Sequence, residues 1–120
     1  LKHLTFVEQW WFSIVLHGHE PGGIWADVDW VADEDWDWHS AVHDSPDQLR
    51  TWLDEAIATS DRLVDGALAR GEGLDVLAAR ERRGGPVSLR WILVHMVEEY
   101  ARHCGHADLI RESIDGVTDL

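Results

Sequence analysis

Residues 88–116 read SLRWILVHMVEEYARHCGHADLIRESIDG and predict one long helix. Ser88 is a residue type that caps helix N-termini, and Val87 with Ile92 can form a hydrophobic staple across the start. Gly116 stands where a helix commonly ends in the left-handed conformation. The predicted helix covers residues 89–115 and spans about 40 Å at the usual rise per residue.

Two more long helices are predicted upstream. Residues 1–17 carry apolar side chains at spacings of three and four, so we expect an amphipathic helix that ends near Gly18. Ser45, Pro46 and Gln48 form a capping-box signal for a helix that continues to about Arg70.

The segments between these helices show no sustained periodicity of hydrophobic residues. Residues 18–44 are rich in tryptophan and aspartate and predict a long loop that has room for a short helical turn. Residues 72–87 predict a connector. Three amphipathic helices leave apolar surface uncovered, because each helix of a bundle needs neighbours on two sides. We therefore expect an all-α bundle whose fourth helix lies upstream or comes from a partner chain.

Composition limits the classes of function. The 120 residues are 45% hydrophobic and fit a single domain over residues 1–120. The net charge of -13 would repel nucleic acid and anionic lipid, so we expect neither as a partner. Cys104 is the single cysteine, and neither a signal-like segment nor a long apolar run is present, which favours a cytoplasmic location.

Polar side chains recur on one face of the last predicted helix. His95, Glu99, His103 and His106 follow one another at steps of four, four and three, so they project from the same side. A bundle interior must satisfy such groups, and a metal ion held between facing helices is one way to do so. The alternative is a set of buried polar side chains that satisfy one another.

Glu99 and His103 are spaced so that both can reach one ion, and a third ligand must come from another helix. His3 is the best candidate, because its neighbours Leu4 and Val7 mark the buried stripe of the first helix. Two imidazoles and one carboxylate leave coordination positions open, as in catalytic sites. Zinc is favoured for the divalent ion, and nickel, manganese and iron are compatible with the same ligands.

Three further residues are expected near this site. We predict that His95 supports the ligands without binding the ion, because a fourth ligand would close the site. His106 is predicted to line the pocket or to form a hydrogen bond inside the bundle. Arg102 is expected in a surface ion pair or in contact with substrate, and Cys104 is expected as a small buried residue.

The eight tryptophans fall into two groups. Those on the predicted helices are expected in the core: Trp10, Trp11, Trp52 and Trp91. Those in the acidic loop predict either a lid over a pocket or a dimer contact: Trp25, Trp30, Trp36 and Trp38.

Residues 1–12 and 88–112 resemble the actinobacterial branch of the DinB/YfiT-like superfamily. The resemblance implies a four-helix bundle that holds a metal with one ligand on its second helix and two on its last. In that superfamily the two ligands on the last helix are usually histidines in the pattern H-x-x-x-H. Here Glu99 takes the first place, which matches the His/Glu/His set of the related mycothiol-dependent maleylpyruvate isomerases. His3, Glu99 and His103 are then the implied ligands, and the superfamily's first helix is expected upstream.

The same resemblance implies metal-dependent chemistry with a low-molecular-weight thiol of the mycothiol type. The expected activity is transfer or isomerisation of a small-molecule substrate by a metal-activated thiol or water. Arg102 or the cluster from Arg80 to Arg83 is a candidate for holding a carboxylate. We expect a homodimer. The alternative is a non-catalytic, metal-containing binding or interaction module of the same fold.

Overall fold

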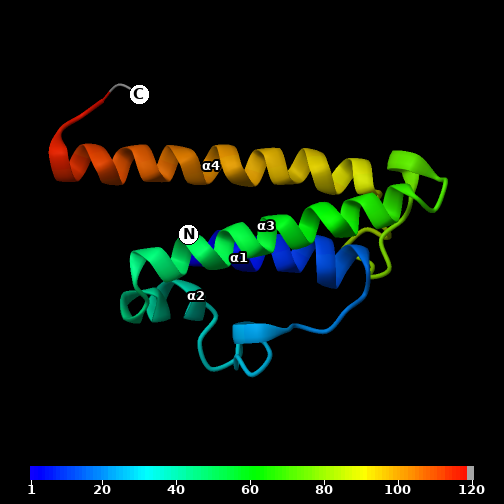
Figure 1. Ribbon diagram of the computed structural model, residues 1–120, viewed down its shortest axis with the longest axis horizontal. Helices are drawn as coiled ribbons and strands as arrows, with labels where there is room; N and C mark the ends of the chain where they lie inside the picture. Colours follow the sequence, from blue (N-terminus) through cyan, green and yellow to red (C-terminus); the bar gives the residue numbers. More distant parts are fainter. Residues whose placement is uncertain (119–120) are drawn as a thin grey trace.

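The computed structural model describes residues 1–118 and contains three long helical segments (Figure 1). Helix α1 (Lys2–Glu8) continues without a break as a π-helix, η1 (Gln9–Leu16). Helix α3 (Pro46–Leu68) and helix α4 (Leu89–Asp115) follow. Residues 1–118 contain no β-strand, so the prediction of an all-α bundle is confirmed.

The helix boundaries follow from local capping chemistry. The Ser45 hydroxyl accepts a hydrogen bond from the backbone N–H of Gln48 at 3.2 Å, and Pro46 is the first residue of α3. The Ser88 hydroxyl accepts from the N–H of Trp91 at 3.3 Å. Gly116 ends α4 with a φ of +74°, a conformation that glycine adopts without strain.

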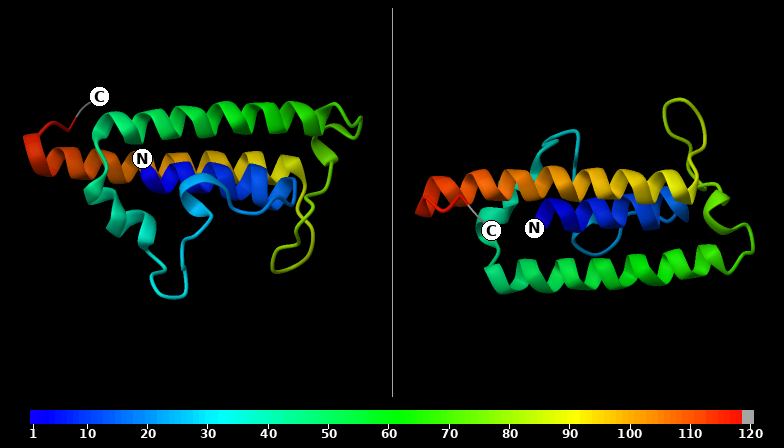
Figure 2. Two further views of the ribbon diagram at one scale, coloured as in Figure 1. Left: turned by 60° about the horizontal axis from the view of Figure 1, so that its bottom comes forward. Right: turned by 90° about the horizontal axis from the view of Figure 1, so that it is seen from above.

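The segment formed by α1 and η1 packs against both other long helices. It runs in the same direction as α3 and opposite to α4, so the first turn of α1 lies beside the middle of α4 (Figures 1 and 2). Apolar side chains of all three helices and of the connector form one core: Val7, Trp11, Phe12, Val15, Leu16, Ala67, Val76, Ala78, Leu89, Ile92 and Met96. This packing fixes α4 against the N-terminal helix.

The loop between η1 and α3 folds against α1. It contains a short 3-10 turn, η2 (Gly23–Trp25), the short helix α2 (Trp36–His39) and a second 3-10 turn, η3 (Ser40–His43). The buried Lys2 ammonium pairs with Asp44 at 2.6 Å and lies 4.5 Å from the centre of the Trp36 ring. These contacts hold the loop at the N-terminal end of α1.

The connector before α4 carries a fourth short turn, η4 (Gly73–Asp75). It is tied to the start of α4 by two backbone hydrogen bonds, from Ala78 to Val87 and from Leu89 to Val76. In the part of the chain that the structure describes, no helix is long and apolar enough to cross a lipid bilayer.

Two expectations about α4 are wrong. Cys104 is exposed, and Trp91 is 44% exposed although its ring stacks on His95. Every residue from 104 to 115 is exposed, because no other part of the described chain covers this half of the helix. Conversely, Trp25 of the loop is only 3% exposed and belongs to the interior.

Candidate metal centre

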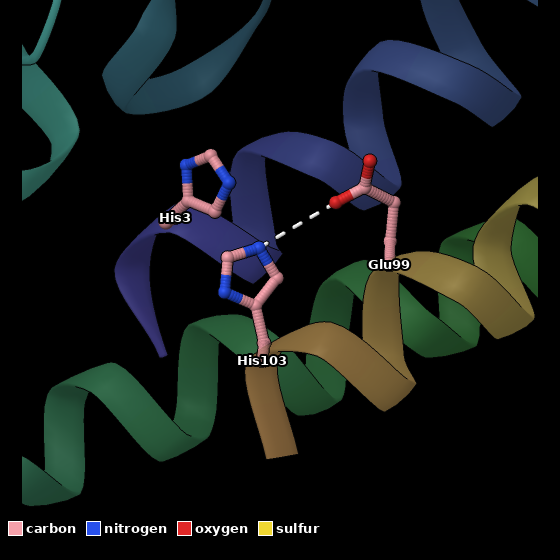
Figure 3. Close-up of side chains that lie close together, drawn as sticks. All are labelled: His3, Glu99 and His103. Carbon is pink, nitrogen blue, oxygen red and sulfur yellow. Dashed lines mark ion pairs between the residues drawn. The ribbon is translucent and has the colours of Figure 1, made fainter. Parts of the chain in front are cut away.

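Three potential metal ligands converge where the first turn of α1 faces the middle of α4 (Figure 3). One ligand atom from each of His3, Glu99 and His103 lies within 4.8 Å of the others. Nε2 of His103 is 3.5 Å from Oε2 of Glu99, and the rings of His3 and His103 are 4.7 Å apart between centroids. The structure brings together the three residues that the sequence singled out.

Asp37 fixes the orientation of His3. Its Oδ2 lies 2.6 Å from Nδ1 of His3, and its side chain is 4% exposed. Because an ionised carboxylate only accepts hydrogen bonds, this contact favours the tautomer with the proton on Nδ1, in which Nε2 has a lone pair for a metal. A carboxylate behind a histidine is the usual support of a metal ligand. Asp37 was not predicted from the sequence, because it lies in the loop between η1 and α3, which has no hydrophobic periodicity.

Two side chains of α4 orient Glu99. Nη1 of Arg102 donates a hydrogen bond to Oε1 of Glu99 at 3.2 Å, and Nε2 of His95 lies 3.2 Å from the same oxygen. Oε2 is left facing His103. The ring of His95 is itself fixed, because it stacks on Trp91 and meets Trp11 edge-on. Arg102 therefore forms an ion pair with Glu99, and the supporting role of His95 stays a prediction.

The donor set fits a divalent ion. Burial is the main cause that lowers the pKa of His103, the nearby His3 lowers it further, and Glu99 acts in the opposite direction. The lowered pKa favours the neutral imidazole, which is the form that binds metals. Two imidazoles and one carboxylate suit zinc and other first-row ions. In residues 1–118 the group contains these three side chains and no fourth ligand.

His106 and Trp38 flank the ligands. His106 is exposed and meets the ring of His103 edge-on at 5.3 Å, so it does not lie inside the bundle. Trp38 stacks on His3 at 4.7 Å and lies 6.0 Å from His103, with 51% of its surface exposed. One tryptophan of the acidic loop therefore packs against the two histidines of the ligand group.

A family model described as mycothiol-S-transferase matches residues 1–116. The chain belongs to the mycothiol-S-transferase family. This membership confirms the resemblance to the DinB-like superfamily and indicates a mycothiol-related transferase that acts on a small molecule. No curated protein and no solved structure matches the chain.

In this mycothiol-S-transferase family member, a partly buried hydrogen-bonded pair, Tyr100 and Glu8, joins α1 to α4. The hydroxyl of Tyr100 donates a hydrogen bond to Oε1 of Glu8 at 2.7 Å, and Glu8 is 5% exposed. Burial first, and then the hydrogen bond and charge of Glu8, raise the pKa of Tyr100 far above its usual value. Tyr100 therefore stays protonated and keeps donating. The pair holds the helix of His3 against the helix of Glu99.

The arginines of the connector in this mycothiol-S-transferase family member lie apart from the ligands. Nη2 of Arg80 donates to the backbone oxygen of His19 at 2.8 Å and to the carboxylate of Glu20 at 2.6 Å. These bonds commit Arg80 to holding the connector against the loop. The guanidinium of Arg82 lies 5.2 Å from the centre of the Trp11 ring.

Proposed function

We propose that this chain binds one divalent metal ion through His3, Glu99 and His103, and that it transfers a low-molecular-weight thiol of the mycothiol type to a small-molecule substrate. Zinc is the favoured ion, and nickel, manganese and iron suit the same ligands. The observation that carries the proposal is the convergence of the three ligand atoms within 4.8 Å in a member of the mycothiol-S-transferase family.

The geometry around the ligands supports catalysis. The three side chains supply one negative charge in total, so a divalent ion would leave the site net positive and attractive to a thiolate. When bound, such an ion supplies Lewis acidity that lowers the pKa of a thiol or of water towards neutrality. The chain's own part is to fix the ligands: Asp37 holds His3, while Arg102 and His95 hold Glu99. Trp38 stacks on the ring of His3.

The proposal is tested by elemental analysis of protein purified without a histidine tag, followed by a screen of thiol-dependent turnover. Glu99→Gln should abolish stoichiometric metal and turnover together while the far-ultraviolet circular dichroism stays unchanged. Glu112→Gln, an exposed position on the same helix, is the matched control and should keep both. Full metal content in the Glu99 variant would refute the ligand assignment.

A metal-loaded protein without thiol-dependent turnover would favour the alternative, a non-catalytic binding module that contains a metal. The absence of a fourth ligand in residues 1–118 argues against that alternative, because purely structural zinc sites are usually closed by four protein ligands. A homodimer and a cytoplasmic location remain predictions from the sequence.

A further inference from the structure

An apolar cavity of about 430 Å³ adjoins the ligand group. Its walls come from the outer face of α1 and η1 and from the loop: His3, Phe6, Val7, Trp10, Pro21 and Trp30. His3 is the one titratable side chain among them, and it is also a ligand of the proposed metal site. A molecule in the cavity would therefore lie directly against the side chain that binds the ion. The volume lies within the range of small-molecule sites.

Aromatic rings form the walls and are held from behind. Phe6 stacks on Trp30 at 4.5 Å with an interplanar angle of 30°, and it contacts Trp10 at 5.9 Å. The buried Trp25 packs against Phe6 at 5.0 Å and against Trp30 at 6.3 Å. Because Trp25 supports both rings, the cavity is formed before a ligand arrives.

The lining of this cavity also lacks negative charge. The chain carries a net charge of -13, yet the described lining of this cavity contains no carboxylate. A ligand with hydroxyl or ammonium groups would find almost no hydrogen-bond partners there and would lose those it has in water. A flat apolar ligand gains burial and ring contacts, since aromatic rings prefer offset or edge-on neighbours at the distances seen here.

We propose that, in the thiol transfer proposed above, this cavity holds the electrophilic substrate and selects one with an apolar, aromatic-ring-sized body. The inference rests on the proposed function. In the reaction, the thiol sulfur attacks the electrophilic carbon, and a carbon–sulfur bond forms. The bond from that carbon to a leaving group such as a halide breaks, the halide departs with the bonding electron pair, and the thiol proton passes to solvent. Atoms and electrons balance without an oxidant.

Turnover of two electrophiles by the zinc-loaded protein with mycothiol tests the selection. Chlorodinitrobenzene has an aromatic body, whereas iodoacetamide is small and polar. Trp30→Ala should lower kcat/KM for chlorodinitrobenzene by about tenfold or more, mainly through KM, because one stacked wall is lost. Turnover of iodoacetamide and zinc content should stay within about twofold of wild type. Val31→Ala, a fully exposed neighbour on the same loop, should leave both reactions unchanged.

Trp30→Phe keeps an aromatic wall and should restore most of the lost kcat/KM, which guards against loss of folding in the alanine variant. An equal loss for both electrophiles in a folded Trp30→Ala variant, or no loss for either, would overturn the inference.

A binding measurement separates this inference from the proposed function. Unreactive dinitrobenzene should quench tryptophan fluorescence saturably in metal-free wild-type protein, and much less in Trp30→Ala. Such binding without turnover of any electrophile would overturn the proposed function and leave the aromatic cavity standing. No saturable binding to wild type would overturn the cavity inference, even if thiol transfer is found.

Discussion

Asp37 offers the sharpest test of the proposed metal centre, because it contacts the proposed ligand His3 without being a ligand itself. Its Oδ2 lies 2.6 Å from Nδ1 of His3, and its side chain is only 4% exposed to solvent. Asp37→Asn keeps the shape of the side chain and the oxygen that accepts from the N–H of Trp38. The substitution removes the negative charge of Asp37. That charge fixes the proton on Nδ1 and thereby makes Nε2 a better electron-pair donor to a metal.

The expected effect is a loss of metal affinity with the fold retained. Removing the support of a metal-bound histidine costs about 10–100-fold in affinity. That range corresponds to about 1.4–2.7 kcal/mol. Competition for zinc against a chromophoric chelator of known affinity measures the difference directly, and circular dichroism checks the helices.

The same loop supplies a matched control for the Asp37 experiment. Asp33 contacts Nδ1 of His39 at 3.0 Å, an exposed copy of the same histidine–carboxylate arrangement that does not touch the ligand group. Asp33→Asn should therefore leave zinc affinity unchanged. The reasoning fails if the Asp37 variant binds zinc as tightly as wild type, or if the Asp33 variant loses as much affinity as the Asp37 variant.

Three further outcomes are expected. A chelator should lower the melting temperature of the zinc-loaded protein by roughly 10 °C, because an ion at a hundred times its dissociation constant contributes about 2.7 kcal/mol to stability; an unchanged calorimetric scan would count against a bound ion. Tyr100→Phe should cost about 1–3 kcal/mol in urea unfolding, since it removes the hydrogen bond of buried Glu8, and an unaltered midpoint would show that the pair is not stabilising. The hydrogen bond to Asp33 raises the pKa of His39, so the stabilisation by this pair is complete below the unfolded histidine pKa of about 6.5 and disappears as pH rises through the folded value. In an NMR titration, Asp33→Asn should lower the His39 pKa from its wild-type value towards the ordinary one. A titration curve identical to that of wild type would contradict this assignment.

The helices were predictable because their ends carry local signals. Ser45, Ser88 and Gly116 act through contacts within one or two turns, so the sequence around each contains all that is needed. The convergence of Glu99 with His103 was equally local, as both stand on one helix four residues apart. His3 was predictable because the buried stripe around it marks its face.

Features that depend on distant segments were not predictable in this way. Asp37 reaches His3 across 34 positions from a loop without a hydrophobic period, so neighbouring residues give no indication of the contact. Cys104 and Trp91 were placed in the core because they stand on an amphipathic helix. Which side of such a helix is covered depends on its partners. In residues 1–118 nothing covers α4 at Cys104, and Trp91 is covered only in part, by contact with Trp11.

The proposed ligands His3 and His103 stand near opposite ends of the described chain, and this separation affects how a bound ion would change unfolding. The ion would close a loop of roughly 100 residues, and a covalent cross-link of that size removes conformational entropy worth about 4.7 kcal/mol from the unfolded chain. A reversible cross-link of this kind would prevent α4 from separating from α1 while the rest of the chain stays folded. Loss of the ion and separation of the terminal helices would then be a single cooperative event.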